Sequence, residues 1–243
     1  MHMYAPNFYG VNGIVGAQVP LGTGIALSCQ YKENGGMCLA LYGNGAANQG
    51  QVFESYNMLH LRKLPVIFVC ENNGYGMGTS ADRAASNIEY YARGDVLPGI
   101  WVDGMDVLAV KSATEFARDY VINNGPLVME VFTYRYSGHS MSDPATSYRT
   151  REEIQEVRQT RDPITSFKEK LLDLELLTQD ELKNIDSRVK KAIDEAASKS
   201  RSDLEIPVEE LYIDVYSNNK EYRIRDVIDY NIVHKNLNTG INM

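Results

Sequence analysis

Polar side chains follow two apolar runs of this sequence, at positions from which they could bind a ligand. Asn44 follows the run 37–42, within a Gly-Asn-Gly tripeptide, and Asn73 follows the run 65–70. If both runs are parallel strands, the two asparagines lie at the carboxyl edge of one sheet, where open α/β sheets bind ligands. The spacing therefore predicts a ligand site at this edge, although an asparagine can also merely support a tight turn with positive φ.

A second group able to do chemistry is His139, which lies in a polar loop. An imidazole exchanges a proton near neutral pH, so it can serve in proton transfer or stabilise a developing oxyanion. A lone histidine in a polar loop is more often an ordinary surface residue. His2, His60 and His234 have no supporting pattern around them, and we expect them to be structural.

The runs around the two asparagines alternate between strand and helix patterns. The apolar runs 37–42 and 65–70 predict buried strands, and the segment 49–63 between them has apolar residues at helical spacing. Such a β-α-β unit has a right-handed crossover and parallel strands. A further helix at 107–121 and a further strand at 127–133 continue the alternation. We therefore expect an α/β fold, a mostly parallel sheet with helices on both faces.

Charged helical segments follow this sheet. A proline directly after an aspartate, at 162–163, is typical of a helix start, and a Thr-x-x-Glu capping box at 178–181 predicts another. We predict two domains, the α/β domain at 1–160 and a helical extension with a C-terminal tail at 161–243.

Composition limits the classes of partner. The 243 residues are 44% hydrophobic, enough for a sizeable core, and their net charge of −8 gives no electrostatic footprint for nucleic acid. No run approaches the roughly 20 apolar residues of a membrane span. We therefore expect small-molecule or protein partners, and neither nucleic acid nor membrane. The scattered Cys29, Cys38 and Cys70 indicate buried structural thiols and a reducing compartment.

Several motifs, in register, make the sequence resemble the alpha subunits of the decarboxylating component of eukaryotic pyruvate dehydrogenase complexes. They are Gly-Ile-Val-Gly-Ala-Gln-Val-Pro (13–20), Ala-Asn-Gln-Gly-Gln (47–51), Glu-Asn-Asn (71–73), Tyr-Gly-Met-Gly-Thr-Ser (75–80), Gly-His-Ser-Met-Ser-Asp-Pro (138–144) and Ser-Tyr-Arg-Thr-Arg-Glu-Glu (147–153). The resemblance extends over at least residues 1–217. It implies a thiamine diphosphate-binding fold and the oxidative decarboxylation of pyruvate, with transfer of the acetyl unit to a lipoyl group for acetyl-CoA synthesis.

The resemblance also implies how the cofactors are held. Magnesium would be bound by the side chains of Asn44 and Asn73 and by the backbone carbonyl of Tyr75, since this cation prefers oxygen ligands. Gly45 and Ala46 would open the helix whose amino end faces the diphosphate.

Further roles follow from the same resemblance. Backbone groups of Gly13 and Val15 would bind the aminopyrimidine of the cofactor, and His139 would lie near the cofactor and assist the reaction. Serines that the family uses for inhibitory phosphorylation match Ser80, Ser140 and Ser147.

The implied partners are a beta subunit, pyruvate, the lipoyl-bearing acetyltransferase component, and a kinase and phosphatase. In this family two alpha and two beta subunits form a heterotetramer, and the beta subunit supplies the carboxylate that activates the cofactor. The implied location is the mitochondrial matrix, although the first thirty residues, without Lys or Arg, resemble no presequence.

Four residues depart from the family's pattern. Asn44 stands in place of a metal-binding aspartate, which removes one negative charge beside the metal. The other three are Val11 for a glycine, Gly74 for an arginine and Ser137 for a histidine. In the family, a segment with a Tyr-Arg pair that grips the diphosphate also lies before the region that this sequence matches. Two alternatives therefore stay open, a catalytically impaired paralogue or fragment that only binds or regulates, and a branched-chain oxoacid dehydrogenase alpha subunit.

Overall fold

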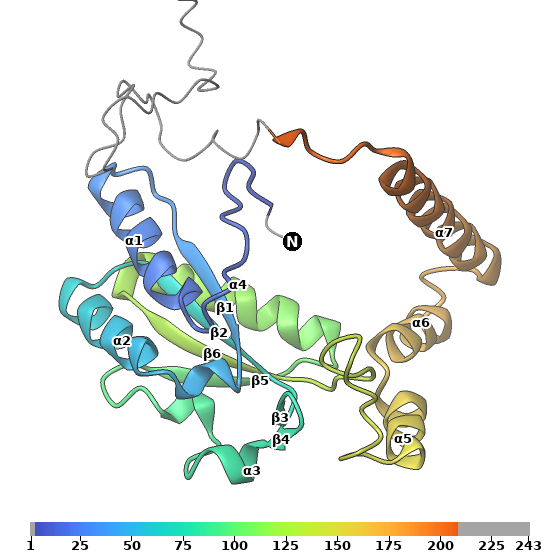
Figure 1. Cartoon of the computed structure of the whole chain (residues 1–243), viewed down its shortest axis with the longest axis horizontal. Helices are drawn as coiled ribbons and strands as arrows, with labels where there is room; N and C mark the ends of the chain where they lie inside the picture. The colour runs from blue at the N-terminus through green and yellow to red at the C-terminus, as the bar shows by residue number, and fades with distance from the viewer. Residues whose placement is uncertain (1–2, 209–243) are drawn as a thin grey trace, which may run out of the picture. The chain divides into compact units, whose positions relative to one another are not determined.

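The structure, a computed structural model that describes residues 3–208, contains a four-stranded parallel sheet (Figure 1). Its order is β1 (Cys38–Gly43), β2 (Val66–Asn72), β6 (Leu127–Phe132) and β5 (Gly99–Asp103). Because every neighbouring pair is parallel, all four carboxyl ends lie at one edge. The predicted α/β class and parallel sheet are confirmed.

The remaining elements precede the sheet, connect its strands or follow its last strand. They are α1 (Gln18–Tyr31), η1 (Ala46–Asn48), α2 (Gly50–Arg62), the hairpin β3 (Tyr75–Gly76) and β4 (Thr79–Ser80), α3 (Ala81–Ala84), η2 (Tyr90–Ala92), α4 (Val107–Asn124), α5 (Arg151–Arg161), α6 (Pro163–Asp173) and α7 (Gln179–Ser202). The helices predicted at 49–63 and 107–121 correspond to α2 and α4.

The sheet has a hydrophobic core on each face, because successive strand residues point to opposite sides. From β2, Phe68 and Cys70 pack with residues of α1 and α2, whereas Ile67 and Val69 pack with residues of α4. A side chain of this kind contributes roughly 1.5–3 kcal/mol when fully buried. Helices therefore cover both faces, as the sequence predicts.

Two of the three cysteines are buried, and all three are free thiols. Burial raises the pKa of the Cys38 thiol to about 11 and raises that of Cys70 further. Such thiols are inert at neutral pH. Cys29 is half-buried, which departs from the expectation of full burial.

Strand β5 and the β3–β4 hairpin are missing from the sequence-based prediction. Strand β5 is an edge strand of five residues, and its apolar run, residues 100–102, is only three residues long. Each hairpin strand has only two residues.

By their contacts the residues form two units, Met1–Leu177 and Thr178–Met243. In the first unit, Arg161 and Lys170 pair with Asp103 and Asp106 at 3.0 and 3.1 Å. Helices α5 and α6 thus belong with the sheet by contacts. The domain division at residue 160 stays a prediction, and its tail beyond residue 208 lies outside the described residues.

The predicted helix starts at 162 and 178 are confirmed. The Asp162 side chain accepts hydrogen bonds from the backbone N–H groups of Ile164 and Thr165, and Pro163 is the first residue of α6. Thr178 and Glu181 form a reciprocal capping box at the start of α7. Within residues 3–208, no helix is long and apolar enough to cross a membrane.

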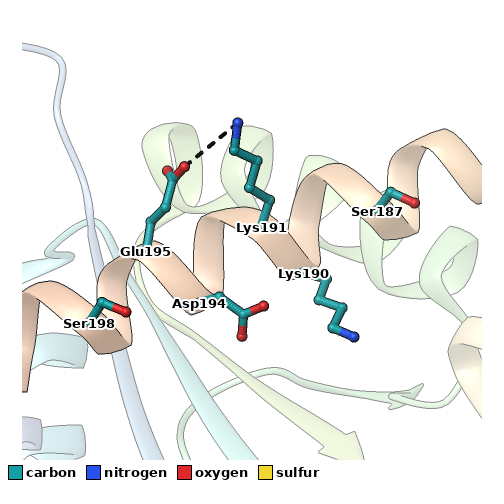
Figure 2. Close-up of a pocket in the computed structure, with 6 residues that line it drawn as sticks. All are labelled: Ser187, Lys190, Lys191, Asp194, Glu195 and Ser198. Carbon is teal, nitrogen blue, oxygen red and sulfur yellow. Dashed lines mark ion pairs between the residues drawn. The ribbon is translucent and has the colours of Figure 1, made fainter.

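Helix α7 carries a pocket of its own, whose lining residues are all on this helix (Figure 2). Lys191 and Glu195 form an ion pair there at 3.8 Å, and both side chains are largely exposed. Exposed pairs of this kind contribute at most about 1 kcal/mol. No residue predicted to bind a ligand lies on α7, so we interpret this surface as a solvated helix face.

Candidate cofactor site

The turns that follow β1 and β2 meet at the carboxyl edge of the sheet. The backbone N–H of Asn44 donates to the carbonyl of Glu71 at 3.2 Å. A Cβ added to Gly45 would lie 3.1 Å from the Cα of Gly76, so the two backbones come together where neither residue has a side chain. This contact places Asn44 beside the Asn73–Tyr75 turn, and thus brings together the residues predicted to hold a metal.

Asn44 is 2% exposed, and its amide oxygen Oδ1 has no hydrogen-bond partner. Leaving a buried acceptor unpaired costs about 1–3 kcal/mol. The hydroxyl of Tyr90 is also buried and unpaired. Burial raises the pKa of Tyr90, and the nearby Asn44 side chain opposes the rise. The side chains of Asn44 and Tyr90 are therefore neighbours, and the amide nitrogen of Asn44 is the group that can donate to the Tyr90 hydroxyl. Its Oδ1 has no partner, which leaves this oxygen available to a ligand.

The turn after β2 is built from asparagine side chains that bond to the backbone two residues ahead. Asn72 Oδ1 accepts from the N–H of Gly74 at 3.0 Å, and Asn73 Oδ1 accepts from the N–H of Tyr75 at 3.2 Å. Gly74 has φ of +78°, a conformation that favours glycine. The departure from the family's arginine at this position therefore fits the backbone that this chain adopts.

The start of the following helix differs from the prediction. Ala46 opens a single 3₁₀ turn, Ala46–Asn48, and α2 begins only at Gly50. Gly45 and Ala46 therefore do not open the long helix. The first N–H groups of a helical turn have no partner within it, so those at the start of this turn can serve the same purpose as at a longer helix.

The Gly-rich segment before α1 lies against the start of α2. Gln51 Nε2 donates to the backbone carbonyl of Val15 at 3.0 Å, and Gly16 has φ of +89° and packs on the side chain of Gln49. Gly13 has open space where a Cβ would be. The structure thus places Val15 near the first turn of α2. The predicted binding of the aminopyrimidine by Gly13 and Val15 stays a prediction.

His139 lies in a loop that Asp143 organises. The carboxylate of Asp143 accepts from the backbone N–H of His139 at 2.8 Å, from that of Ala145 at 2.8 Å and from the hydroxyl of Tyr148 at 2.6 Å. The bonds from Tyr148, His139 and Ala145 lower the pKa of Asp143 to about 2. The His139 residue itself is exposed.

Arg149 packs this loop against the turn after β2. It is 3% exposed, and its guanidinium donates to the carbonyls of Arg135 and Ser137. It also lies 5.2–5.6 Å from the ring centroids of three tyrosines, Tyr75, Tyr134 and Tyr148. The rings of Tyr75 and Tyr148 are 5.1 Å apart. The loop that carries His139 is therefore packed on Tyr75, a predicted metal ligand.

Comparison with known proteins decides the family. The model of a family described as "Dehydrogenase E1 component" matches residues 1–209. The chain belongs to this family. It is 60% identical to a probable pyruvate dehydrogenase E1 component subunit alpha, mitochondrial, of Caenorhabditis elegans, over 96% of this chain and 59% of that protein. It is 60% identical to the Sminthopsis macroura subunit alpha, over 93% and 62%, and 58% identical to the Homo sapiens somatic form, over 93% and 58%. The chain spans about three fifths of the length of these relatives.

The dehydrogenase E1 family depends on thiamine diphosphate. The residues present fit a cation held by its diphosphate, because the unpaired Asn44 Oδ1 lies beside a turn that adds a second amide oxygen and a carbonyl. In the described part of the chain, no group of three or more His, Cys, Asp or Glu could hold a metal. The predicted donors are amide and backbone oxygens, which are ligands of another kind.

The three serines predicted to be phosphorylation sites lie in two neighbouring segments. Ser140 and Ser147 are exposed in the His139 loop, and Ser140 Oγ lies 3.0 Å from Ser142 Oγ. Ser80 ends β4 and precedes α3, where its hydrogen bond lowers the pKa of Asp82. Arg135, which donates to the carbonyl of Met77 at 2.6 Å, joins the loop to this hairpin.

Sequence-based reasoning missed three residues that shape the site, Tyr90, Glu130 and Arg149. Arg149 lies within the motif 147–153, and nearby tyrosines at 134, 136 and 148 were a signal for a cation that packs on aromatic rings. Glu130 is a single charge inside an apolar strand, which is a signal for a buried carboxylate with dedicated donors. Tyr90 has no such local signal.

Proposed function

We propose that this chain is an alpha-type subunit that binds thiamine diphosphate and magnesium for the oxidative decarboxylation of pyruvate, with transfer of the acetyl unit to a lipoyl group. The observation that carries the proposal is the buried, unpaired Oδ1 of Asn44 beside the Asn73–Tyr75 turn. Pyruvate dehydrogenase E1 alpha subunits at 58–60% identity support the choice of pyruvate over a branched-chain oxoacid.

The roles of the residues follow from this assignment. Asn44 Oδ1, Asn73 Oδ1 and the carbonyl of Tyr75 hold magnesium, and the N–H groups at Gly45 and Ala46 face the diphosphate. When bound, thiamine diphosphate supplies the electron sink that decarboxylation of an oxoacid needs. Backbone groups of the Gly13–Val15 segment orient its aminopyrimidine. His139 donates a hydrogen bond or a proton beside the reacting carbon.

The proposed partner is a beta subunit, with two copies of each chain in a heterotetramer, and the beta subunit supplies the activating carboxylate. Large apolar side chains on α1 support a protein partner, since Leu21, Leu27 and Tyr31 are 51%, 44% and 88% exposed. The lipoyl-bearing acetyltransferase would accept the product, and a kinase and phosphatase would act on the loop serines. The mitochondrial names of the relatives support a place in the matrix.

A second candidate function is a catalytically silent subunit that only docks on partners. Asn44 favours it, because a neutral amide replaces a carboxylate beside a divalent cation. Co-expression with a pyruvate dehydrogenase beta subunit separates the two functions. We expect decarboxylation of pyruvate that requires added thiamine diphosphate, and slower turnover of branched-chain oxoacids. A stable complex without decarboxylation of any oxoacid would establish the silent subunit instead.

Phosphorylation of the His139 loop should weaken cofactor binding more than phosphorylation of the hairpin. A phosphate adds a charge of about −1.5 to −2 and repels a diphosphate nearby. We expect Ser140→Glu to lower the affinity for thiamine diphosphate roughly tenfold, about 1.4 kcal/mol, and Ser80→Glu to lower it less. Calorimetry on the assembled complex measures both, with Ser140→Gln as the neutral control. Equal affinities for the parent and both glutamate variants would remove the loop from the cofactor site.

A further inference from the structure

Two charged side chains are buried among residues 3–208, Glu130 and Arg149. Arg149 is explained by the carbonyls and rings that surround it. Glu130 is 2% exposed and lies in the middle of β6, between strands β2 and β5. A buried charge is costly unless its hydrogen bonds are satisfied. The donors that bind Glu130 therefore indicate which segments of the chain it positions.

Both carboxylate oxygens of Glu130 accept a hydrogen bond. Oε1 accepts from Asn72 Nδ2 at 2.7 Å, and Oε2 accepts from the backbone N–H of Tyr91 at 3.0 Å. Both donors are neutral, and no Lys or Arg of the described chain forms an ion pair with Glu130. Two neutral donors, one on each oxygen, therefore hold this carboxyl group behind the candidate site.

The first of these bonds fixes the turn that carries two proposed metal ligands. Because Nδ2 of Asn72 points to Glu130, its Oδ1 is directed the other way and accepts the N–H of Gly74 at 3.0 Å. The bond to Gly74 shapes the Asn73–Tyr75 turn. Without the Glu130 carboxylate, the amide of Asn72 could turn over and present Nδ2 to the N–H of Gly74, which would break the turn.

The second bond holds the segment that lies beside Asn44. Tyr91 lies in η2, directly after Tyr90, whose buried hydroxyl is the neighbour of Asn44. One carboxylate thus ties the turn of β2 and the segment beside Asn44 to the same strand.

We propose that Glu130 is a positioning residue for the cation of the cofactor, an inference that rests on the proposed function. It orients the Asn73–Tyr75 turn through Asn72, and it holds the segment beside Asn44 through the N–H of Tyr91. The carboxylate acts through these neighbours and touches neither the metal nor the substrate.

The substitution Glu130→Gln tests both parts at nearly constant shape. A glutamine places an N–H₂ group opposite Asn72 Nδ2 or the N–H of Tyr91, and it removes the charge. In the complex with a beta subunit, we expect the magnesium concentration that half-saturates thiamine diphosphate binding to rise at least about tenfold. Glu54→Gln, an exposed position on α2, is the matched control and should leave that concentration unchanged.

A double variant restores the hydrogen bonds with reversed polarity. In Glu130→Gln with Asn72→Asp, the glutamine N–H₂ donates to the new carboxylate, which still accepts from Gly74, and the buried charge returns. We expect magnesium affinity within about threefold of the parent. If Glu130 served only stability, Glu130→Gln would lower the urea midpoint of unfolding and leave the magnesium titration of the folded complex unchanged, which would overturn the proposal.

Hydrogen exchange measured without any cofactor tests this inference independently of the proposed function. The amides of Gly74 and Tyr75 should exchange at least about tenfold faster in Glu130→Gln than in the parent, because local opening releases them. Unchanged exchange would overturn the positioning role. The two tests can also give different outcomes. If the parent complex binds no thiamine diphosphate, while Glu130→Gln still exchanges faster than the parent, the proposed function is refuted and the link from Glu130 to the turn is established.

Discussion

Replacing Arg149 with methionine should cost about 2–5 kcal/mol of stability, because it leaves buried acceptors unsatisfied, at about 1–3 kcal/mol each, and removes a cation packed on aromatic rings. The carbonyls of Arg135 and Ser137 lose their donor, and three tyrosine rings lose the cation packed against them. Methionine keeps most of the stem, so the loss reports on the guanidinium. Urea unfolding measures the free energy, and limited proteolysis should show faster cleavage within residues 135–149.

The matched control is Arg118→Met on α4, where the arginine is exposed and pairs with Asp119 at 2.9 Å. An exposed pair contributes less than about 1 kcal/mol, so this variant should unfold close to the parent. Equal losses of stability in the two variants would contradict this prediction. They would show that the buried guanidinium of Arg149 contributes no more to stability than the exposed guanidinium of Arg118.

The largest expected effect on binding comes from Asn44. An aspartate there restores a negative ligand beside magnesium, so Asn44→Asp should raise magnesium-dependent affinity for thiamine diphosphate at least about tenfold, or roughly 1.4 kcal/mol. Asn44→Ala removes the ligand and should abolish binding. The free energy of unfolding should change little in Asn44→Ala, because Oδ1 has no hydrogen-bond partner to lose. Asn44→Asp buries a charge, so it should lower the stability of the metal-free chain and recover it when magnesium binds.

Titration of magnesium at fixed thiamine diphosphate, on the parent and both variants, measures this ordering. Asn44 is not among the residues with positive φ, so it is not kept for a left-handed turn. A structural role alone would therefore give three coincident titration curves.

The sequence predicted the elements whose signal is local. The runs that became β1 and β2 are continuous and apolar because both faces of these strands are covered, and the capping box of α7 involves residues only three apart. The placement of Asn44 and Asn73 at one edge followed from the β-α-β unit alone. The 3₁₀ turn at Ala46–Asn48 could not be distinguished from the first turn of α2, because the two segments are separated by a single residue.

The supports of the site could not be predicted because they depend on long-range pairing. Glu130 meets Asn72, 58 positions earlier, only because β6 pairs with β2, and it meets Tyr91 across 39 positions. Arg149 meets Tyr75 only after the loop folds back on the hairpin. No periodicity within one segment encodes these contacts. These contacts follow from the strand order. The right-handed β-α-β rule reduces the number of possible strand orders but does not select one.

The most direct test of the central claim is the calorimetric titration of thiamine diphosphate into the complex of this chain with a beta subunit, with magnesium present and with magnesium chelated. We predict saturable binding of one thiamine diphosphate for each copy of this chain when magnesium is present, and a loss of at least about a hundredfold in affinity, roughly 2.7 kcal/mol, when it is removed. Absence of binding under both conditions, in a complex shown to be folded, would contradict the assignment of the Asn44 and Asn73–Tyr75 site.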